Sequence, residues 1–266
     1  MKSKKIAICV LATNGFSQPK LWNFFLKNSS DKFNTYMHNK NLDVNLTEPE
    51  KTFLIPNTVK TEWGNISLVS ASLEIFREAL KNQENQYFVL VSGDCIPTND
   101  KEYIYSYYMS SCRSSLQCHA FNEKLAKRFN CISDKELFKI ENFQKHSQWV
   151  GLNREAAQFF IKNDYTHKFT NCLAPDEYYF GTIMKTLGID FEIKDTTHLT
   201  FPNIHVKKWD GVKGSNPNAH PIIFSEENPI KEDSFLDFKA PFFRKIATEK
   251  YYNLPDYVYK KLKLRL

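Results

Sequence analysis

Continuous apolar segments and amphipathic segments alternate along the first half of the chain. Residues 5–11 and Tyr87–Val91 are uninterrupted apolar runs of strand length, a pattern typical of parallel strands that are buried on both faces. Pro19–Asn28 and Ile66–Leu80 carry apolar side chains at helical spacing, and Phe33–Met37 adds a short strand. This alternation predicts a doubly wound α/β half, in which ligands bind beyond the carboxyl ends of the strands.

The second half of the chain predicts less regular elements. They are a helix over Asn99–Ser110, a strand over Ser147–Leu152, and helices over Arg154–Asn163 and Pro175–Leu187. Asn99 or Asp100 is expected to cap the first of these helices. A proline starts the last one, where its missing N–H leaves no helical hydrogen bond unmade. Asp195–Phe224 contains several prolines and glycines and is expected to form long, functional loops with short strands.

The composition favours one globular domain. The chain has 266 residues, 42% of them hydrophobic and 25% charged. The apolar run Ile6–Ala12 continues into Thr13-Asn14-Gly15 without a cleavage signal, so we interpret it as a strand rather than a signal peptide. No other stretch approaches the roughly 18 apolar residues of a membrane span. We therefore expect a soluble or cytoplasmic chain.

The six cysteines show no Cys-x-x-Cys pair and no repeated spacing. Zinc sites usually need such pairs, so we expect no zinc site. Without a signal peptide we also expect the thiols to be reduced.

The net charge of +6 is modest and is partly concentrated in the C-terminal YKKLKLRL. This segment could contact nucleic acid or, peripherally, an anionic membrane, but the simpler interpretation is a solvated helical end. No pattern of a known nucleic-acid-binding motif accompanies it, so we expect no nucleic-acid partner. The basic excess is better explained by a small ligand that carries phosphate.

Asp94 follows an apolar strand in YFVLVSGDCIP, close to the expected carboxyl end of the sheet. An aspartate in this place commonly meets a ribose hydroxyl or a metal ion, and it equally commonly caps the following turn. Spacing alone does not choose between these two roles. No Asp-x-Asp, the usual metal motif of nucleotide-sugar transferases, occurs in the chain.

Cationic side chains would then have to meet the charge of a bound diphosphate. The candidates are Lys207, Lys208, Lys213, Arg244 and Lys245. The pair Arg244-Lys245 stands out because it lies in the otherwise apolar and aromatic APFFRKI, although an ordinary surface pair would also fit.

Gln148 and Trp149 lie at a strand edge in HSQWVGLNR. A tryptophan ring beside an amide is typical of sugar binding, since the ring packs on C–H groups and the amide binds hydroxyls. A buried core tryptophan is the competing interpretation, and without further context it is the preferred one.

Asp176 and Glu177 follow Pro175 at the expected start of a helix, in CLAPDEYYFGTIM. Carboxylates are common at this position because the helix dipole favours negative charge there. The pair could therefore cap the helix, or one member could accept a proton from a substrate.

Seven segments together make the chain resemble glycosyltransferase family 14, which contains core-2/I-branching β-1,6-N-acetylglucosaminyltransferases, peptide O-xylosyltransferases and plant branching-enzyme-like proteins. They follow the family order from about residue 5 to about residue 246: KIAICVLATNG, YMH, TEWGNISLVSASL, YFVLVSGDCIP, HSQWVGLNR, APDEYYFGTIM and FFRKI. Each is weak by itself, and the set in order is specific.

The resemblance implies a GT-A-like Rossmann-type fold with a mostly parallel central sheet. It implies a nucleotide-sugar half (residues 1–115), an acceptor and catalytic half (116–246) and a basic C-terminal helical segment (247–266). It also implies inverting transfer from a UDP-sugar to a glycan hydroxyl without a metal or other cofactor. GlcNAc is the expected sugar, with xylose or an inactive carbohydrate-binding protein as alternatives.

The resemblance also assigns residues to roles. Glu177 falls on the catalytic base. Asp176, on the acceptor side, then caps the helix or orients Glu177. Gln148 and Trp149 fall on the acceptor side as well. The donor-side residues are Thr13, His38, Trp63, Asp94, Arg244 and Lys245.

Two positions depart from the family pattern. Animal members often read His-Val-Asp where this chain has His38-Asn39-Lys40, so an acidic donor contact is missing here, as it is in plant-like members. His220 stands near the position where some members place a further arginine for the diphosphate.

Overall fold

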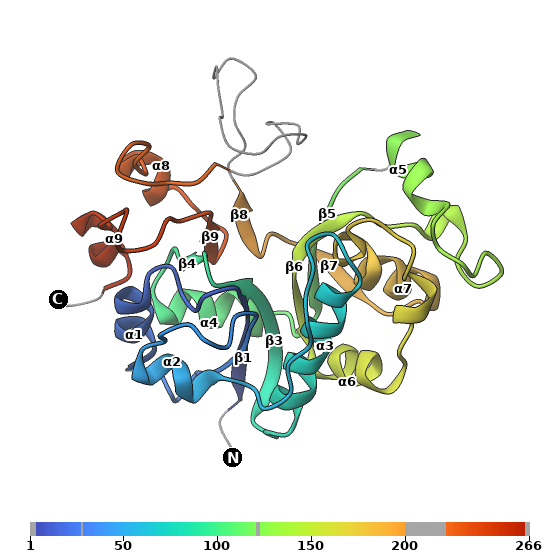
Figure 1. The fold of residues 1–266 in the computed structure, drawn as a ribbon, viewed down its shortest axis with the longest axis horizontal. Helices are drawn as coiled ribbons and strands as arrows, with labels where there is room; N and C mark the ends of the chain where they lie inside the picture. The colour runs from blue at the N-terminus through green and yellow to red at the C-terminus, as the bar shows by residue number, and fades with distance from the viewer. Residues whose placement is uncertain (1–3, 28, 121–122, 200–221, 264–266) are drawn as a thin grey trace.

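A six-stranded sheet forms the centre of the protein in a computed structural model that describes residues 4–27, 29–120, 123–199 and 222–263 (Figure 1). The strand order is β2–β1–β3–β6–β5–β7, and β6 alone in this sheet runs antiparallel to its neighbours. The strands are β1 (Lys5–Ala12), β2 (Phe33–Asn39), β3 (Asn85–Ser92), β5 (Ser114–Cys118), β6 (His146–Asn153) and β7 (Phe191–Ile193). The mixed, mostly parallel sheet agrees with the predicted GT-A-like Rossmann-type class.

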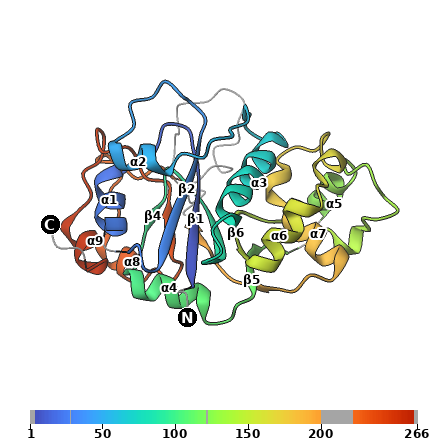
Figure 2. The ribbon, with the colours of Figure 1, turned by 90° about the horizontal axis from the view of Figure 1, so that it is seen from below.

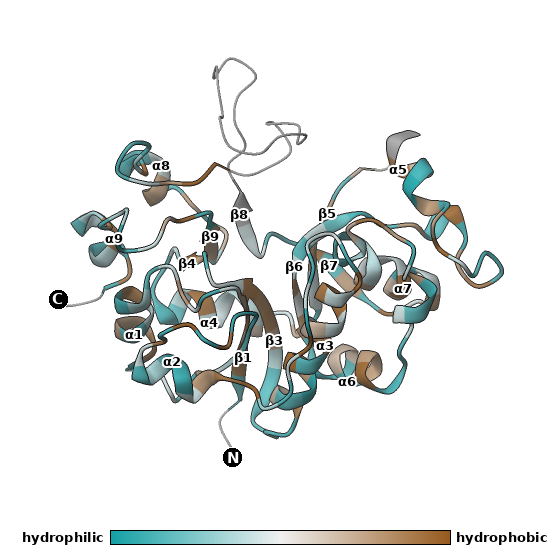
Figure 3. Ribbon diagram, in the orientation of Figure 1, coloured by the Kyte–Doolittle hydropathy of each residue, from teal (hydrophilic) through white to brown (hydrophobic). Residues whose placement is uncertain are grey.

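The strands β1 and β3 are apolar throughout because each contributes to two cores. Successive side chains of a strand point to opposite faces, so Ala7 and Cys9 enter one core while Ile8 and Val10 enter the other. Figure 3 shows hydrophobic colouring along β3 in the middle of the molecule. The apolar runs read from the sequence are thus central strands covered on both sides.

Helices cover both faces of this sheet (Figure 2). Side chains of α1 (Pro19–Lys27) and α4 (Lys101–Met109) pack into one core. Those of α3 (Ser67–Leu80), α6 (Arg154–Lys162) and α7 (Tyr179–Leu187) pack into the other. The predicted helices that correspond to α1, α3, α4 and α6 are confirmed within two residues at each end, and the side chain of Asp100 caps α4.

The predicted helix Pro175–Leu187 is wrong in its first turn. Pro175–Glu177 forms a short 3₁₀ turn, and α7 begins only at Tyr179. Ala174, which precedes the turn, has a left-handed φ of 51°. The residue before α7 is Tyr178, so Asp176 is not the helix cap that the sequence suggested.

A smaller three-stranded sheet, in the order β4–β9–β8, lies beside the central one (Figure 1). Its strands are β4 (Ile96–Pro97), β8 (Thr197–Leu199) and β9 (Phe242–Arg244). Most of the predicted loop Asp195–Phe224 lies outside the described residues. The candidates Lys207, Lys208, Lys213 and His220 lie there too.

The remaining short helices are α2 (Glu48–Phe53), α5 (Glu123–Phe129), α8 (Glu232–Leu236) and α9 (Asp256–Lys261), with 3₁₀ turns at Ile140–Asn142 and Thr166–Lys168. Two lysines of the basic C-terminal segment contact the protein itself. Lys261 Nζ donates to the carbonyl of Phe235 at 2.8 Å, and Lys263 forms an ion pair with Asp100. Peripheral membrane contact through this segment stays a prediction.

One pair of cysteines contradicts the expected reduced thiols. Cys131 and Cys172 form a disulfide, with their Cα atoms 5.0 Å apart. They are 41 residues apart in sequence, so no short spacing motif predicts the pair. Cys9, Cys95, Cys112 and Cys118 are free thiols. Within the described ranges, no helix has the length and apolar character required to cross a membrane.

Candidate active site

A cleft of about 470 Å³ opens where the carboxyl ends of β1, β2 and β3 meet. Parallel strands end at the same edge of a sheet, which is why residues distant in sequence gather here. The segment after β9 and part of β6 complete the lining. Eight of the ten predicted site residues line this cleft: Thr13, His38, Trp63, Asp94, Gln148, Trp149, Arg244 and Lys245.

Two loops approach each other closely at the floor of this cleft. Gly15 has a φ of +72°, a conformation that glycine adopts without steric cost. A Cβ atom on Gly93 would lie 2.2 Å from the carbonyl oxygen of Gly15. Ser17 N also donates to the carbonyl of Gly93 at 2.7 Å. Glycine at position 93 therefore lets the loop after β3 pack on the loop after β1.

Asp94 contacts both members of the predicted basic pair in the lining of the cleft. Its two oxygens accept from Arg244 Nε at 3.1 Å and Arg244 Nη2 at 3.2 Å, and Lys245 Nζ lies 3.6 Å from Oδ2. Burial raises the pKa of Asp94, but Arg244 and Lys245 outweigh that effect and the pKa lies below its usual value. Asp94 is therefore an ionised carboxylate that orients Arg244.

Trp149 is buried and supports the same arginine. Only 3% of its surface is exposed, and the guanidinium carbon of Arg244 lies 4.7 Å from the ring centroid. This distance permits a cation–π contact. Arg244 lies over the ring of the buried Trp149. The stacking of a sugar on Trp149 stays a prediction.

His38 is buried and fastens a neighbouring segment. Its Nε2 lies 3.0 Å from the backbone nitrogen and 3.1 Å from the carbonyl oxygen of Val59, and burial lowers its pKa. A histidine whose pKa is lowered is neutral at pH 7. His38 thus holds the chain that leads to Trp63, which stands 76% exposed at the rim of the cleft. Thr13 is exposed and Gln148 is half-buried in the same lining.

Glu177 does not line this cleft, although its turn contacts the rim. The N–H of Ala174 donates to the carbonyl of Gly64 at 2.7 Å, next to Trp63. A Cβ on Gly64 would meet Leu173 at 3.2 Å. The turn that carries Glu177 is therefore anchored to the segment that bears the exposed tryptophan.

Two cations hold one oxygen of the Glu177 carboxylate. Oε2 lies 2.9 Å from Lys145 Nζ and 3.2 Å from Arg128 Nη1. Burial raises the pKa of Glu177, but Lys145 and then Arg128 outweigh it, so the pKa lies below its usual value. Among the described residues, none donates a hydrogen bond to Oε1. Glu177 is thus ionised, with one oxygen held and the other available to a substrate.

Asp176, the neighbouring carboxyl, behaves in the opposite way. It is 6% exposed, and its Oδ1 has no hydrogen-bond partner. Burial, and next the charge of Glu177, raise its pKa to about 7. Environment therefore separates the two adjacent acids: at neutral pH Glu177 is ionised, whereas Asp176 is partly protonated and enclosed.

A second cavity of about 520 Å³ has Lys145 in its lining. It is lined by Cys118, His119, Ala120, Ile140, Glu141, Phe143, Gln144, Lys145, Lys185 and Ile193. Because Lys145 contacts Glu177 and also lines this cavity, a molecule bound there would lie near the carboxylate.

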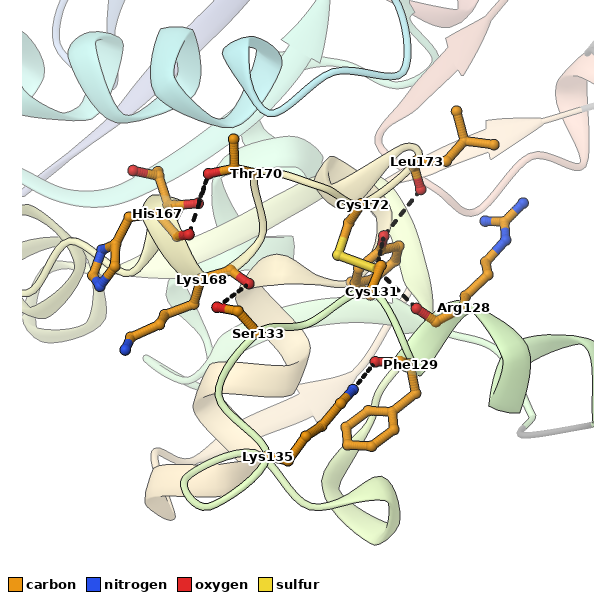
Figure 4. Close-up of a disulfide and its surroundings, with 12 residues drawn as sticks. Arg128, Phe129, Cys131, Ser133, Lys135, His167, Lys168, Thr170, Cys172 and Leu173 are labelled. Atoms are coloured by element: carbon orange, nitrogen blue, oxygen red, sulfur yellow. Dashed lines mark hydrogen bonds between the residues drawn. A yellow bond between two sulfur atoms is a disulfide. The ribbon is translucent and has the colours of Figure 1, made fainter.

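The sequence did not point to Lys145, Arg128 or the disulfide. Lys145 stands immediately before the SQW segment, which was its only available signal. Arg128 is one basic residue of a short, ordinary helix. Figure 4 shows the disulfide between the chain that follows Arg128 and the chain that reaches Leu173.

No cluster of three or more potential metal ligands occurs in the part of the chain that the structure describes. The predicted metal independence is a statement about activity and stays a prediction.

A cleft at the carboxyl edge of a mostly parallel sheet is the place where doubly wound α/β proteins bind their ligands, so the fold and the cleft define a ligand-binding α/β protein of this class. The sequence pattern of the Core-2/I-Branching enzyme family matches residues 6–232, and the chain belongs to that family. The resemblance to glycosyltransferase family 14 is thereby confirmed.

A curated relative supports the same family. Glycosyltransferase BC10 of Oryza sativa subsp. japonica is 25% identical over 272 residues, which cover 88% of this chain. The match spans 66% of that relative's length, slightly less than two thirds. The relative is by name a glycosyltransferase, in agreement with the predicted class of enzyme.

Proposed function

We propose that the chain is an inverting glycosyltransferase that moves a sugar, GlcNAc in the first place, from a UDP-sugar to a hydroxyl of a glycan acceptor. The observation that carries this proposal is the Glu177 carboxylate, held through Oε2 by two cations beside the cleft. Membership of the family and the name of the rice relative agree with it.

The proposed base is Glu177. Its Oε1 takes the proton of the acceptor hydroxyl while that oxygen attacks the anomeric carbon. The bond between the anomeric carbon and the diphosphate oxygen breaks on the opposite face, and UDP leaves with the bonding electron pair. Lys145 and Arg128 keep Glu177 ionised before the reaction.

The leaving diphosphate gains charge in the transition state, so fixed cations stabilise that state more than the ground state. Arg244 suits a bidentate phosphate contact, and Lys245 suits a point-charge contact. Asp94 and Trp149 orient Arg244 in the absence of donor. No metal is required in this scheme.

The acceptor is proposed to enter from the second cavity. Lys145 lines that cavity and contacts Glu177, and Gln144 contributes an amide to the lining. An acceptor hydroxyl that reaches Glu177 from this cavity would lie between the base and the anomeric carbon of the donor, as a single displacement requires.

The substitution Glu177→Gln tests the proposal. Transfer should fall by roughly 10²- to 10⁴-fold, the usual contribution of a general base, while UDP affinity measured by calorimetry stays unchanged. Glu155→Gln, at an exposed position on α6, is the control and should transfer normally. Full turnover by the Glu177 variant would remove this residue from the role.

The identity of the sugar needs a separate measurement. Thermal shift with equal concentrations of UDP-GlcNAc, UDP-xylose, UDP-glucose and UDP-galactose should show the largest stabilisation by UDP-GlcNAc, since the stabilisation grows with the logarithm of ligand affinity. A larger shift with UDP-xylose would favour a xylosyltransferase. Binding without transfer to any acceptor would favour a carbohydrate-binding protein.

A further inference from the structure

The disulfide lies between the two segments that meet at Glu177. Cys131 follows Arg128 by three residues, and Cys172 precedes Glu177 by five. Arg128 Nη1 in turn contacts Glu177 Oε2 at 3.2 Å. The covalent link and the ion pair therefore close one ring of chain, with the carboxylate at one side and the sulfur bridge at the other.

Other contacts hold these segments farther from the carboxylate. Ser133 N donates to the carbonyl of Lys168 at 3.0 Å, and Lys168 forms an ion pair with Asp134 at 3.1 Å. Next to Glu177, Tyr178 Oη donates to the carbonyl of Leu173 at 3.0 Å within the same segment and lies 3.6 Å from Cys131 Sγ. Along the two segments, the disulfide thus lies between the Ser133–Lys168 contact and the Arg128–Glu177 contact.

The Arg128–Glu177 ion pair forms only if the two side chains are held close together, because the pair by itself contributes little free energy. The side chain of Arg128 is 39% exposed, and ion pairs with this exposure contribute little unless the partners are held in position. Lys145 is 16% exposed and needs less support, since its Nζ also donates to the carbonyl of His146 at 3.2 Å. Loss of the disulfide should therefore affect Arg128 before Lys145.

We propose that Arg128 is a positioning residue for Glu177 and that the Cys131–Cys172 disulfide holds it there, so that the oxidised pair is the fully active form. This inference rests on the proposed function of Glu177. Reduction by a dithiol converts the bridge into two thiols, while the reductant is oxidised to its own disulfide. Arg128 is then free to leave Oε2.

Several other titratable groups face Glu177. They are Asp176 and Tyr178 on its own segment, Lys145 and His146 at the start of β6, and His119 after β5. Of these groups Tyr178 contacts the disulfide, with its Oη 3.6 Å from Cys131 Sγ, and it directly follows the turn that carries Glu177. A change on reduction should consequently report Arg128 and the position of the turn.

The first test compares Arg128→Met with Arg128→Lys in the disulfide-bonded protein. Without the cation the pKa of Glu177 rises, so the acid limb of the kcat profile should move to higher pH and kcat should fall roughly tenfold. The lysine variant should restore part of both. An acid limb that does not move in Arg128→Met would overturn the positioning role.

The second test removes the bridge in two ways, by dithiothreitol on the wild type and by Cys131→Ser/Cys172→Ser. Both should reproduce the shift seen for Arg128→Met, and in the Arg128→Met background reduction should add little. Cys112→Ser, at an exposed free thiol, is the matched control and should respond to the reductant as the wild type does. An unchanged pH profile after verified reduction would contradict the tether.

A readout without catalysis separates this inference from the proposed function. Carboxyl-carbon NMR should show the Glu177 pKa rising on reduction, and hydrogen exchange should increase over residues 172–178. If both change while no nucleotide sugar supports transfer, the tether stands and the proposed function fails. If transfer depends on Glu177 but neither readout changes, the tether fails alone.

Discussion

At the scale of single residues, the site works through differences between neighbours of similar chemistry. Asp176 and Glu177 are adjacent acids, yet one has a raised pKa and the other a lowered pKa. The difference arises because Lys145 and Arg128 reach Glu177, whereas Asp176 is enclosed without a partner for Oδ1. The proposed division of roles between the two acids follows from this environment.

The raised pKa of Asp176 predicts how the free energy of unfolding depends on pH. The pKa of Asp176 is about 7 in the folded protein against about 4 when unfolded, so the folded state binds the proton more tightly. The free energy of unfolding should therefore fall from about pH 4 to pH 7, by up to a few kcal/mol, and stay low above that. Asp176→Asn should remove this fall, as measured by denaturation at several pH values.

The control for that variant is Asp190→Asn. Asp190 is exposed and pairs with Arg113, and its pKa lies below the usual value because of that hydrogen bond. Its loss should not reduce the fall in stability between pH 5 and pH 7. The burial argument would be contradicted if Asp176→Asn lost stability with pH as steeply as the wild type.

The contacts of Arg244 lead to a prediction about UDP affinity. Arg244→Lys keeps the charge but loses the bidentate contact with Asp94 and the packing on Trp149. Loss of a charge-assisted contact costs about 1.5–3 kcal/mol, so UDP should bind roughly tenfold or more weakly by calorimetry. Lys245→Arg is the comparison and should have a smaller effect. Equal UDP affinity in Arg244→Lys and wild type would exclude Arg244 from the phosphate site.

At the scale of elements, the cleft depends on loops that follow strands. The loop after β1 and the loop after β3 meet at Gly15 and Gly93, and the segment after β9 adds the basic pair. The turn before α7 then brings Glu177 to the rim through Ala174 and Gly64. Elements that are far apart in sequence therefore share one edge of the sheet.

The close approach of the two loops at Gly93 predicts what a larger side chain there does to stability and donor affinity. Its Cβ would lie 2.2 Å from a backbone oxygen, so Gly93→Ala must separate the two loops and should cost about 1–3 kcal/mol as well as donor affinity. Gly188→Ala is the control, because Gly188 has a positive φ of 67° and no neighbour within 4 Å of a Cβ. It should lose about 1 kcal/mol and bind UDP normally. Normal UDP binding by Gly93→Ala would show that the close approach is not needed.

At the scale of the whole molecule, one sheet unites the two predicted halves. β3 and β6 pair directly, so the predicted nucleotide-sugar half and the half that carries Glu177 share a framework. The division into residues 1–115, 116–246 and 247–266 remains a functional prediction. Because the chain has no Asp-x-Asp and its candidate diphosphate contacts are cationic side chains, the charge balance favours metal-free transfer.

This balance predicts that transfer persists in EDTA at the rate seen before chelation. The measurement is initial rate with and without the chelator, followed by addition of Mn²⁺ or Mg²⁺. A strict requirement for either ion would contradict the proposed role of Arg244 and Lys245 as the groups that meet the diphosphate.

Much of this molecule follows from local pattern. Periodic burial requires apolar residues at periodic positions, so the sequence predicts strands and helices directly. This holds for the strands β1, β2, β3 and β6 and for the helices α1, α3, α4 and α6. The ordered motifs led to the family and to eight residues that do share a cleft. The sequence by itself therefore determined the class of fold and the edge at which the site forms.

Tertiary structure alone decided the details of the chemistry. The antiparallel direction of β6, the turn that replaces the first helical turn before α7, and the Cys131–Cys172 bridge all depend on contacts between distant segments. So do the ion pairs of Glu177 and the enclosure of Asp176. A pKa depends on which groups lie within a few ångströms in space, and residue order does not specify those distances.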